Sequence, residues 1–371
     1  MNTNDKNQVS QDLIPWDEPV NGNDLIEELK TAITSFIIIP PEEALTVTYW
    51  ILHTHMIKDP HEPQVFSVSP ILNISSPEKQ CGKSTLREII AEWVKAPLTV
   101  MNATQASIFR VIESSRPTLL IDEADTFLQG KNELIGILNS GYKQDGHVLR
   151  QAGKTYEETK QFSTWSAKCI AGIGRLSDTI ESRCLIIKLK RKKTSEKVQR
   201  RNSLLKNDPT YFTDYKRKIM RFVQDNEISI INQEVDMPME LNDRQQDNWE
   251  GIFKIAKFLG NDELKLVTSA SIFLCQQKIE PLSISIQLLG DIKSIMESSV
   301  TNSFTSQDLV AELKKMEDRP WLDLNRTGIN PNSLAQLLND FEIRPKQIRF
   351  DHKNLRGYEK SDFEDAFSRY L

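Results

Sequence analysis

The segment best suited to hold a phosphate group is SPEKQCGKST, residues 76–85. It follows an apolar run and precedes a stretch with helical spacing, so backbone N–H groups would point outward from the start of a helix. Gly82, Lys83 and Ser84 supply the close backbone, the cation and the metal-binding hydroxyl that such a site needs. The residues that we expect to surround the phosphates are Pro77, Glu78, Lys79, Gln80, Cys81, Gly82, Lys83, Ser84 and Thr85.

A simpler alternative is that Lys83 only begins a helix. The general pattern G-x-x-x-x-G-K-[ST] has a glycine where this chain has Pro77. A GKS triplet is a weak signal by itself, so the prediction of a phosphate site depends on a second motif.

That second motif is a pair of acids at the end of an apolar run, in LLIDEAD. At such a position Asp122 would hold Mg²⁺ through water, together with Ser84, and Glu123 would polarise the attacking water. Two bare carboxylates repel each other, so a bound cation explains their adjacency. The alternative is an acidic cap on the next helix. Together the two motifs predict a site for ATP and Mg²⁺, with Lys83 and Glu123 as catalytic residues.

These motifs need a scaffold in which strand ends lie side by side, and residues 63–194 predict one. Short apolar runs alternate there with helical patterns, which indicates crossover connections and a mostly parallel sheet covered on both faces. The expected strands are Val65–Val68, Pro70–Ser75, Leu98–Met101, Thr118–Asp122 and Ala167–Ile173, with a further apolar run at Leu185–Leu189. The expected helices between them are Ser84–Lys95, Gln105–Ser114 and Asn132–Asn139.

Four further regions are expected around this core. Residues 1–23 are polar and predicted to be flexible, and residues 24–62 predict two helices, the first of them capped by Asp24. Residues 195–282 predict a helical lid. Residues 283–371 predict three helices and a β-hairpin, which are the elements of a winged helix.

Composition limits the class of protein. The chain has 371 residues, of which 39% are hydrophobic and 27% charged, as in globular rather than disordered proteins. Its four cysteines form no CxxC pair, which argues against a zinc ribbon or a disulfide scaffold and fits a reducing cytoplasm. No run approaches a membrane span, and the net charge of −5 restricts any nucleic-acid site to a local basic surface.

Arg183 lies in the segment Glu-Ser-Arg-Cys, between the expected strand Ala167–Ile173 and the apolar run Leu185–Leu189. Ring-forming AAA+ clamp loaders carry a similar Ser-Arg-Cys, and their arginine reaches the γ-phosphate bound by the next subunit. This resemblance makes Arg183 the expected arginine finger, with Arg175 second, and implies a homo-oligomeric ring, with a hexamer favoured. The alternative is an ion pair of Arg183 with Asp178 or Glu181. Arg244 is expected either to reach the nucleotide from the lid or to form a salt bridge within it.

Three basic surfaces predict contacts with single-stranded DNA. Residues 188–201 hold eight basic side chains, residues 141–162 predict a hairpin like those that line the channel of ring helicases, and the C-terminal hairpin would be a wing. The expected contact residues are Lys143, His147, Arg150, Lys154, Lys190, Arg191, Lys353 and Arg356. The alternatives are a solvated linker, a hairpin used for subunit packing and a protein-docking domain, respectively.

Taken together, the motifs resemble a family known mainly as a domain of unknown function in phage and plasmid helicase-like proteins, which are often fused to primase modules. The resemblance covers about residues 35–371. It rests on HTHM, SPEKQCGKST, LLIDEADTFL, GILNSGY, AGIGRLSDTIESRC, DRQQDNW and EDRPW…GYEKSDFEDA. It implies an AAA+-type or helicase-type ATPase of mobile elements, in which Pro77 is normal.

The expected fold class is α/β, a P-loop NTPase (AAA+-like) parallel-sheet core with a helical lid and a C-terminal winged-helix-like domain. We expect a cytoplasmic, Mg²⁺-dependent ATPase that forms a ring and translocates on DNA as a helicase for replication of a phage, plasmid or other mobile element. A primase or loader protein would be a further partner, and no membrane would be involved. The alternative is a nucleotide-switched AAA+ assembly or defence protein that acts on a protein partner without DNA translocation.

Overall fold

The apolar runs of the sequence are buried in two units of the computed structural model, Met1–Gln277 and Lys278–Leu371. Each unit has hydrophobic cores of its own. The structure describes residues 13–77, 79–100, 104–124, 132–152, 158–173, 176–276, 284–299, 301–316, 319–324, 328–341, 343–350 and 353–371.

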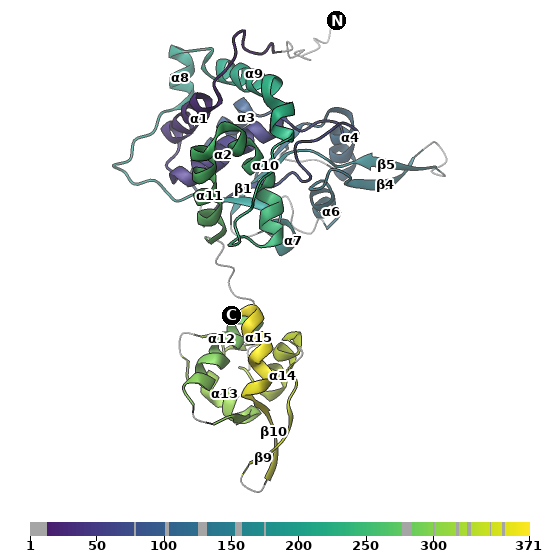
Figure 1. Ribbon diagram of the computed structural model, residues 1–371, viewed down its shortest axis with the longest axis vertical. Coiled ribbons are helices and arrows are strands. Elements are labelled where there is room, and N and C mark those ends of the chain that lie inside the picture. The colour runs from purple at the N-terminus through teal and green to yellow at the C-terminus, as the bar shows by residue number, and fades with distance from the viewer. Residues whose placement is uncertain are drawn as a thin grey trace, which may run out of the picture. The chain divides into compact units, whose positions relative to one another are not determined.

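A parallel sheet of five strands forms the centre of the first unit, which confirms the prediction of a parallel sheet (Figure 1). The strand order is β2-β3-β6-β1-β7. Every neighbouring pair is parallel, so the carboxyl ends of all five strands lie at one edge. The strands are β1 (Ile71–Ser76), β2 (Pro97–Val100), β3 (Thr118–Ile121), β6 (Lys168–Ile173) and β7 (Cys184–Lys188).

Two sets of helices cover the two faces of this sheet. In β1, Leu72 and Ile74 point into one core cluster and Ile71 points into the other. The first face carries α1 (Gly22–Phe36), α2 (Pro41–His55), α3 (Lys83–Trp93), α8 (Arg201–Asn207), α9 (Tyr211–Ile231), α10 (Asp243–Leu259) and α11 (Asn261–Gln276). The second face carries α4 (Gln105–Ser115), α6 (Asn132–Ser140) and α7 (Asp178–Glu181).

The N-terminal helices and the helices of the predicted lid share one core with the sheet. Residues of α1, α2, α9, α10 and α11 all belong to the first core cluster. The hydroxyl of Tyr49 in α2 also donates a hydrogen bond to Glu263 in α11, at 2.8 Å. The helical layer on this face is therefore assembled from both ends of the first unit.

Two local predictions were wrong. Helix α1 is capped by Asn21 rather than Asp24, because the Asn21 side chain accepts hydrogen bonds from the N–H groups of Asn23 and Asp24. Val65–Val68 is not a strand and forms only an isolated bridge from Val68 to Lys143. Its apolar side chains are buried against helices instead, as in the stacking of Phe66 on His53 of α2, 4.2 Å between ring centres.

A β-hairpin is inserted between β3 and β6, as predicted. It pairs β4 (His147–Ala152) with β5 (Glu158–Ser163) in antiparallel register. Phe162 of β5 packs against Phe109 of α4, with ring centres 4.8 Å apart, which anchors the base of the hairpin. The rest of the hairpin projects from the side of the first unit (Figure 1).

The second unit combines helices with a small antiparallel sheet of order β8-β10-β9. The predicted helices and hairpin are present, whereas the three-residue strand β8 was not predicted. The elements are α12 (Ile284–Glu297), β8 (Ser303–Thr305), α13 (Ser306–Lys314), α14 (Pro331–Leu338), η2 (Asn339–Phe341), β9 (Lys346–Phe350), β10 (Lys353–Glu359), η3 (Lys360–Phe363) and α15 (Glu364–Tyr370). Asp291 is buried in this core and is bound by Trp321 Nε1 at 2.8 Å and by Arg319 at 3.0 Å.

The first residue of β6, Lys168, is a buried lysine. Lys168 is 1% exposed, and its Nζ donates to the carbonyl oxygens of Gly141 and Ser166, both at 2.7 Å. Burial lowers the pKa of Lys168 to about 7, from 10.5. Two donated hydrogen bonds match the two hydrogens of a neutral amine.

We expect this lysine to make the stability of the protein depend on pH. Between about pH 7 and pH 10 the unfolded chain keeps the lysine proton and the folded chain does not, so Lys168 contributes a rise of the free energy of unfolding with pH of at most about 1.4 kcal/mol per unit. In urea denaturation at pH 7.5 and 9.5, Lys168→Met should lack this rise. His53 does not titrate in this range, because burial and then Lys168 lower its pKa to about 3. Equal pH slopes for both proteins would contradict the assignment.

Candidate functional site

The predicted phosphate-binding segment forms the turn between β1 and α3. Gly82 has φ of 93° and precedes the first residue of α3, Lys83. A Cβ here would lie 2.3 Å from Cδ1 of Ile37, the end of a side chain that can move, so it is the backbone conformation that calls for glycine. Lys83 Nζ lies 2.6 Å from Oγ of Ser76, the last residue of β1. The lysine is thereby held over the end of the strand from which the turn begins.

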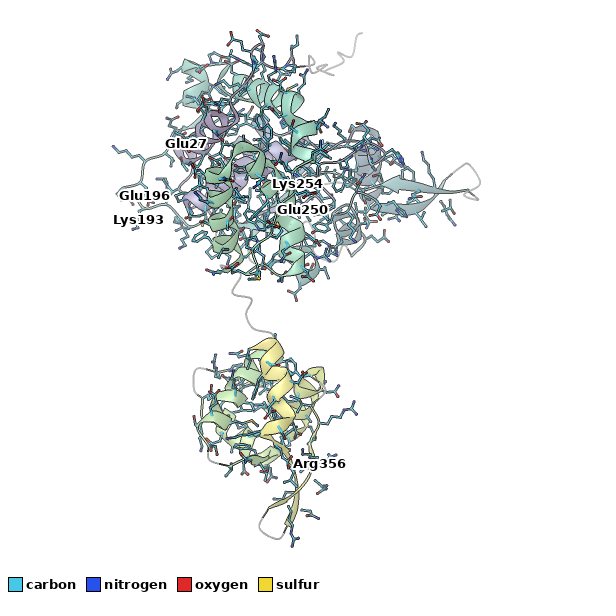
Figure 2. All side chains as sticks on the ribbon, in the orientation of Figure 1. Glu27, Lys193, Glu196, Glu250, Lys254 and Arg356 are labelled. Carbon is cyan, nitrogen blue, oxygen red and sulfur yellow. The ribbon has the colours of Figure 1, made fainter. Side chains whose placement is uncertain are left out.

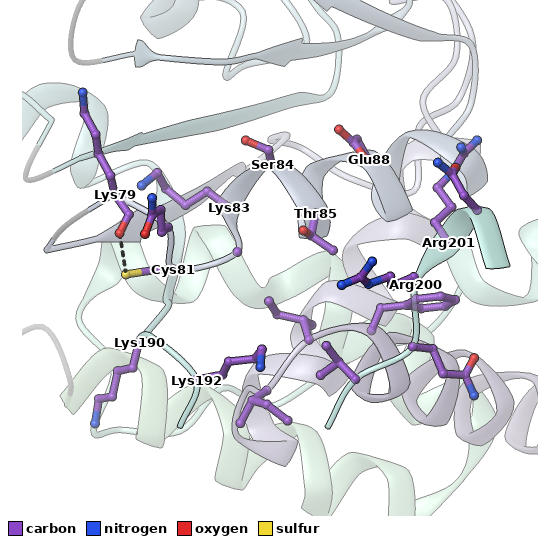
Figure 3. A pocket seen from close by; sticks show the side chains of 18 of the residues that line it. Lys79, Cys81, Lys83, Ser84, Thr85, Glu88, Lys190, Lys192, Arg200 and Arg201 are labelled. Carbon is purple, nitrogen blue, oxygen red and sulfur yellow. Dashed lines mark hydrogen bonds between the residues drawn. The ribbon is translucent and has the colours of Figure 1, made fainter. Parts of the chain in front are cut away.

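This turn borders a cavity of about 1060 Å³ (Figure 3). A cavity of this volume is large enough for a ligand of the size of a nucleotide. Its charged lining is strongly positive, with six cations against two carboxylates. The cations are Lys79, Lys83, Lys190, Lys192, Arg200 and Arg201, and the carboxylates are Glu88 and Glu123. Gln80, Cys81, Gly82, Ser84 and Thr85 also line it.

The end of α1 supplies an apolar part of the lining that the sequence did not reveal. Phe36, Ile37 and Ile38 border the cavity together with Val198. A nucleotide needs such a surface for its base, beside a polar surface for its phosphates. The apolar run before Pro40 could have suggested this part of the lining, but such a run is equally typical of a helix packed in the core.

The basic stretch that begins at residue 188 lies beside the turn between β1 and α3. Lys190 was predicted to contact nucleic acid, but the structure places it in the cavity lining. Arg191 does not line the cavity, and it donates a hydrogen bond to the Lys79 carbonyl oxygen at 3.3 Å. The cause is the sheet order, because β7 lies next to β1 and the residues that follow these strands therefore meet. Arg201 is bound to Glu92, in the last turn of α3.

The acidic pair follows β3 at the same edge of the sheet. Glu123 lines the cavity, and its φ of 50° is rare for a residue with a side chain. Asp122 is bound by Arg87 of α3, with Nε 3.1 Å from Oδ2, while its Oδ1 accepts the N–H of Glu123 at 2.9 Å. Arg87 is buried and also contacts Thr99 at 3.4 Å.

Ser84 and Asp122 are the oxygen ligands that this edge offers to a Mg²⁺ ion, and of the two only Ser84 is among the residues that line the cavity. Ser84 has an exposed hydroxyl in the cavity lining, and each oxygen of Asp122 accepts one hydrogen bond and has a lone pair left for a metal-bound water. Among the described residues, no group of three or more His, Cys, Asp and Glu side chains is arranged to hold a metal alone. A metal here would therefore be shared with phosphate oxygens.

Arg183 and Arg244 do not line this cavity. The guanidinium carbons of both lie over the ring of Tyr142, at 5.5 Å and 5.3 Å from its centre. Arg183 donates to the carbonyl oxygen of Thr179 and, at 3.5 Å, to the hydroxyl of Ser182. The structure places Arg244, expected either to reach the nucleotide or to form a salt bridge within the lid, beside Arg183 and 3.8 Å from Asp247 of the same helix.

The remaining predicted residues are distributed over three places. Lys143 and His147 lie at the base of the hairpin and line a cavity of about 230 Å³ next to Arg183. Arg150 lies on β4, opposite Lys160, with its guanidinium 5.3 Å from the ring centre of Phe109. Arg356 lies exposed on β10 (Figure 2). Glu78, Lys154, Arg175 and the side chain of Lys353 lie outside the described residues.

A family model described as "Protein of unknown function (DUF3631)" matches residues 188–370, slightly less than half of the chain. The match is with a family of unknown function, as the resemblance predicted, but it begins after Lys83 and Asp122. Its description names no activity.

The chain is also similar to a curated relative and to solved structures, of which one is described here. The relative is "Uncharacterized 28.9 kDa protein in xis 5'region" of Saccharopolyspora erythraea, 28% identical over 168 residues, which are 44% of this chain and 62% of the relative. The chain thus spans about three fifths of the length of this relative. The structure, "The A form apo structure of NrS-1 C terminal region-CTR", has a TM-score of 0.47 and 9% identity over 94% of this chain and 77% of that chain.

Of the helices formed by the described residues, none is long and apolar enough to cross a membrane.

Proposed function

We propose that this protein is a Mg²⁺-dependent ATPase of the P-loop, AAA+-like type, with a helical lid and a winged-helix-like C-terminal unit. The observation that carries the proposal is the cavity at the carboxyl edge of a parallel sheet, into which both Lys83 and Glu123 face. Open α/β sheets bind their ligands at this edge. A cavity with six cations, an apolar end and a helix N-terminus suits a nucleoside triphosphate.

The residues at this edge of the sheet would have separate roles in the reaction. Lys83 stabilises the charge on the outer phosphate oxygens, and Glu123 orients the attacking water and accepts its proton. Ser84 and Asp122 would hold Mg²⁺, which when bound neutralises phosphate charge. Arg87 fixes the Asp122 carboxylate at 3.1 Å and so acts as a positioning residue.

The proposal further specifies that the ATPase forms a ring and acts as a DNA helicase. It would work in the replication of a phage, plasmid or other mobile element. Arg183 would act in trans as the arginine finger of such a ring, with a hexamer favoured. The hairpin β4–β5 supports DNA binding, because Arg150 and Lys160 lie opposite each other on a projecting ribbon. Single-stranded DNA would be gripped there through its phosphates, and a primase or loader would be an additional partner.

ATP hydrolysis by the wild-type protein, with and without single-stranded DNA, tests the proposal. We expect turnover that depends on Mg²⁺ and is stimulated by DNA less strongly as salt rises. Turnover indifferent to DNA would refute the helicase and favour a nucleotide-switched assembly that acts on a protein. Absence of both ATP binding and turnover would refute the ATPase itself.

The hairpin makes its own prediction for DNA binding. Arg150→Ala with Lys160→Ala should weaken binding of single-stranded DNA and lower its salt dependence by about 0.7 in slope for each phosphate that is no longer neutralised. Fluorescence anisotropy over a series of salt concentrations measures both quantities. Lys206→Ala with Lys265→Ala removes the same charge from α8 and α11 and should change only the long-range attraction. An equal change of slope in the two double variants would place the DNA elsewhere.

A further inference from the structure

Two arginines from distant parts of the chain meet on one buried aromatic ring. Arg183 comes from the segment before β7 and Arg244 from the first turn of α10, and their guanidinium carbons lie 5.5 Å and 5.3 Å from the centre of the Tyr142 ring. Tyr142 is 1% exposed, and its hydroxyl donates to Oδ1 of Asn248 at 2.7 Å. The amide of Asn248 in turn donates to the carbonyl oxygen of Ser182 at 3.0 Å. Tyr142 and Asn248 therefore join the two arginine-bearing segments into one cluster.

This arginine cluster lies at the amino edge of the sheet, opposite to the turn proposed to bind phosphate. The carbonyl oxygen of Arg183 accepts the N–H of Ile71, the first residue of β1. The turn that bears Lys83 follows Ser76, at the other end of the same strand. Five residues of strand span roughly 17 Å. An arginine side chain at the amino edge therefore does not reach the phosphates of its own chain.

The electrostatics of this cluster favour an anion. Burial, followed by the charge of Arg244, lowers the pKa of Arg183. Nε of Arg183 is buried and finds no hydrogen-bond acceptor among the described residues. Asp247 approaches Arg244 only to 3.8 Å. Two guanidinium groups that repel each other, with Asp247 as the one carboxylate paired with either of them among the described residues, gain stability when an anion binds to both.

We propose that Arg183 and Arg244, held on the Tyr142–Asn248 support, act together on the triphosphate in the cavity of a second copy of this chain and stabilise the charge that develops on it in the transition state. This inference rests on the proposed ATPase function. A cavity of about 230 Å³ opens beside Arg183, and the Arg244 side chain is 39% exposed, so both cations are accessible from outside. Planar guanidinium groups match the oxygens of a phosphate that carries developing charge, and each contact strengthens in the transition state.

The proposal makes Arg244 a ligand in trans, and mixtures of inactive variants test this directly. In a ring, one copy supplies the cavity and its neighbour supplies the arginines. An equimolar mixture of Lys83→Ala and Arg244→Ala should regain turnover, because about a quarter of randomly formed interfaces combine an intact cavity with an intact arginine pair. A mixture of Arg183→Ala and Arg244→Ala should stay inactive, because no neighbour then offers both arginines.

If Arg244 served the cavity of its own chain, the two mixtures would behave in the opposite way. The first mixture would stay inactive and the second would regain turnover, and this result would overturn the proposal. Wild-type turnover with no recovery in either mixture would also overturn it, whereas wild-type protein without ATP binding or turnover would refute the ATPase itself. Loss of single-stranded DNA binding by Arg244→Ala at unchanged turnover would assign the cluster to nucleic acid and reject the proposal.

Two further measurements separate this role from a structural one. Arg244→Ala alone should bind a fluorescent ATP analogue as tightly as the wild type while its kcat falls by about 10²-fold or more. Arg244→Lys should restore part of kcat, because the charge is kept without the planar fork. Tyr142→Phe, which keeps the ring and loses the bond to Asn248, should lower kcat less than Tyr142→Leu, with KM nearly unchanged in both. Weakened ATP binding in all four variants would indicate unfolding or a role in cis, and would reject the proposal.

Discussion

Lys83→Ala should abolish ATP hydrolysis and weaken ATP binding by at least tenfold. Lys83 is the first residue of α3, and its Nζ lies 2.6 Å from Ser76 Oγ at the end of β1, so its charge is held where the outer phosphates would lie. A hydrogen bond to a charged group contributes about 1.5–3 kcal/mol, which corresponds to a factor of about 10 to 100 in affinity. Turnover suffers more, because the lysine also stabilises charge that develops in the transition state.

Titration with a fluorescent ATP analogue and a phosphate-release assay measure the two effects of Lys83→Ala separately. Lys265→Ala is the matched control, because Lys265 is exposed on α11 and pairs only with Asp262 among the described residues. It should bind and hydrolyse ATP like the wild type. Full turnover in Lys83→Ala would refute the assignment of this cavity to ATP.

Glu123→Gln should keep ATP binding and lose turnover by about 10²-fold or more, because a base in general acid–base catalysis contributes about 10²–10⁴-fold. Glu123 lines the cavity, and its backbone is held at φ of 50° by the turn after β3. Glutamine preserves the shape and hydrogen bonding of the side chain but cannot accept the proton of the attacking water. The variant should therefore accumulate the ATP-bound state, and a ring that assembles on ATP should persist.

Single-turnover hydrolysis and size-exclusion chromatography with ATP measure these two consequences of Glu123→Gln. The control is Glu240→Gln, which makes the same chemical change at an exposed position between α9 and α10. A rate near that of the wild type for Glu123→Gln would show that another group activates the water. Loss of ATP binding would instead give Glu123 a role in positioning the nucleotide.

Local sequence patterns predicted the parts of the site that lie within single strand–turn–helix units. Gly82, Lys83 and Ser84 follow one strand and Asp122 and Glu123 follow another, so the parallel sheet places both motifs at one edge. The same patterns misassigned Val65–Val68, because β-branched and aromatic residues are buried equally well outside a sheet. They also missed β8, which is only three residues long and is defined by its pairing with β10.

These patterns could not predict contacts between side chains that belong to different strand–turn–helix segments. The sequence around Arg87 does not predict its contact with Asp122. The sequence around Arg244 does not predict that it packs on the same tyrosine ring as Arg183. Likewise, eight basic residues in 188–201 indicate a phosphate-binding surface without saying whose phosphates. Lys190 belongs to the cavity because β7 pairs with β1.

The sequence by itself determined the alternating strands and helices, the parallel sheet, the turn between β1 and α3 and the position of the acidic pair after β3. Each of these depends on residue types and spacing within about 30 residues, where periodicity and turn chemistry act directly. Only the tertiary structure decided which cations join the cavity and that Arg183 and Arg244 lie at the opposite edge of the sheet. These features depend on strand order and helix packing, which arise from contacts between residues far apart in the chain.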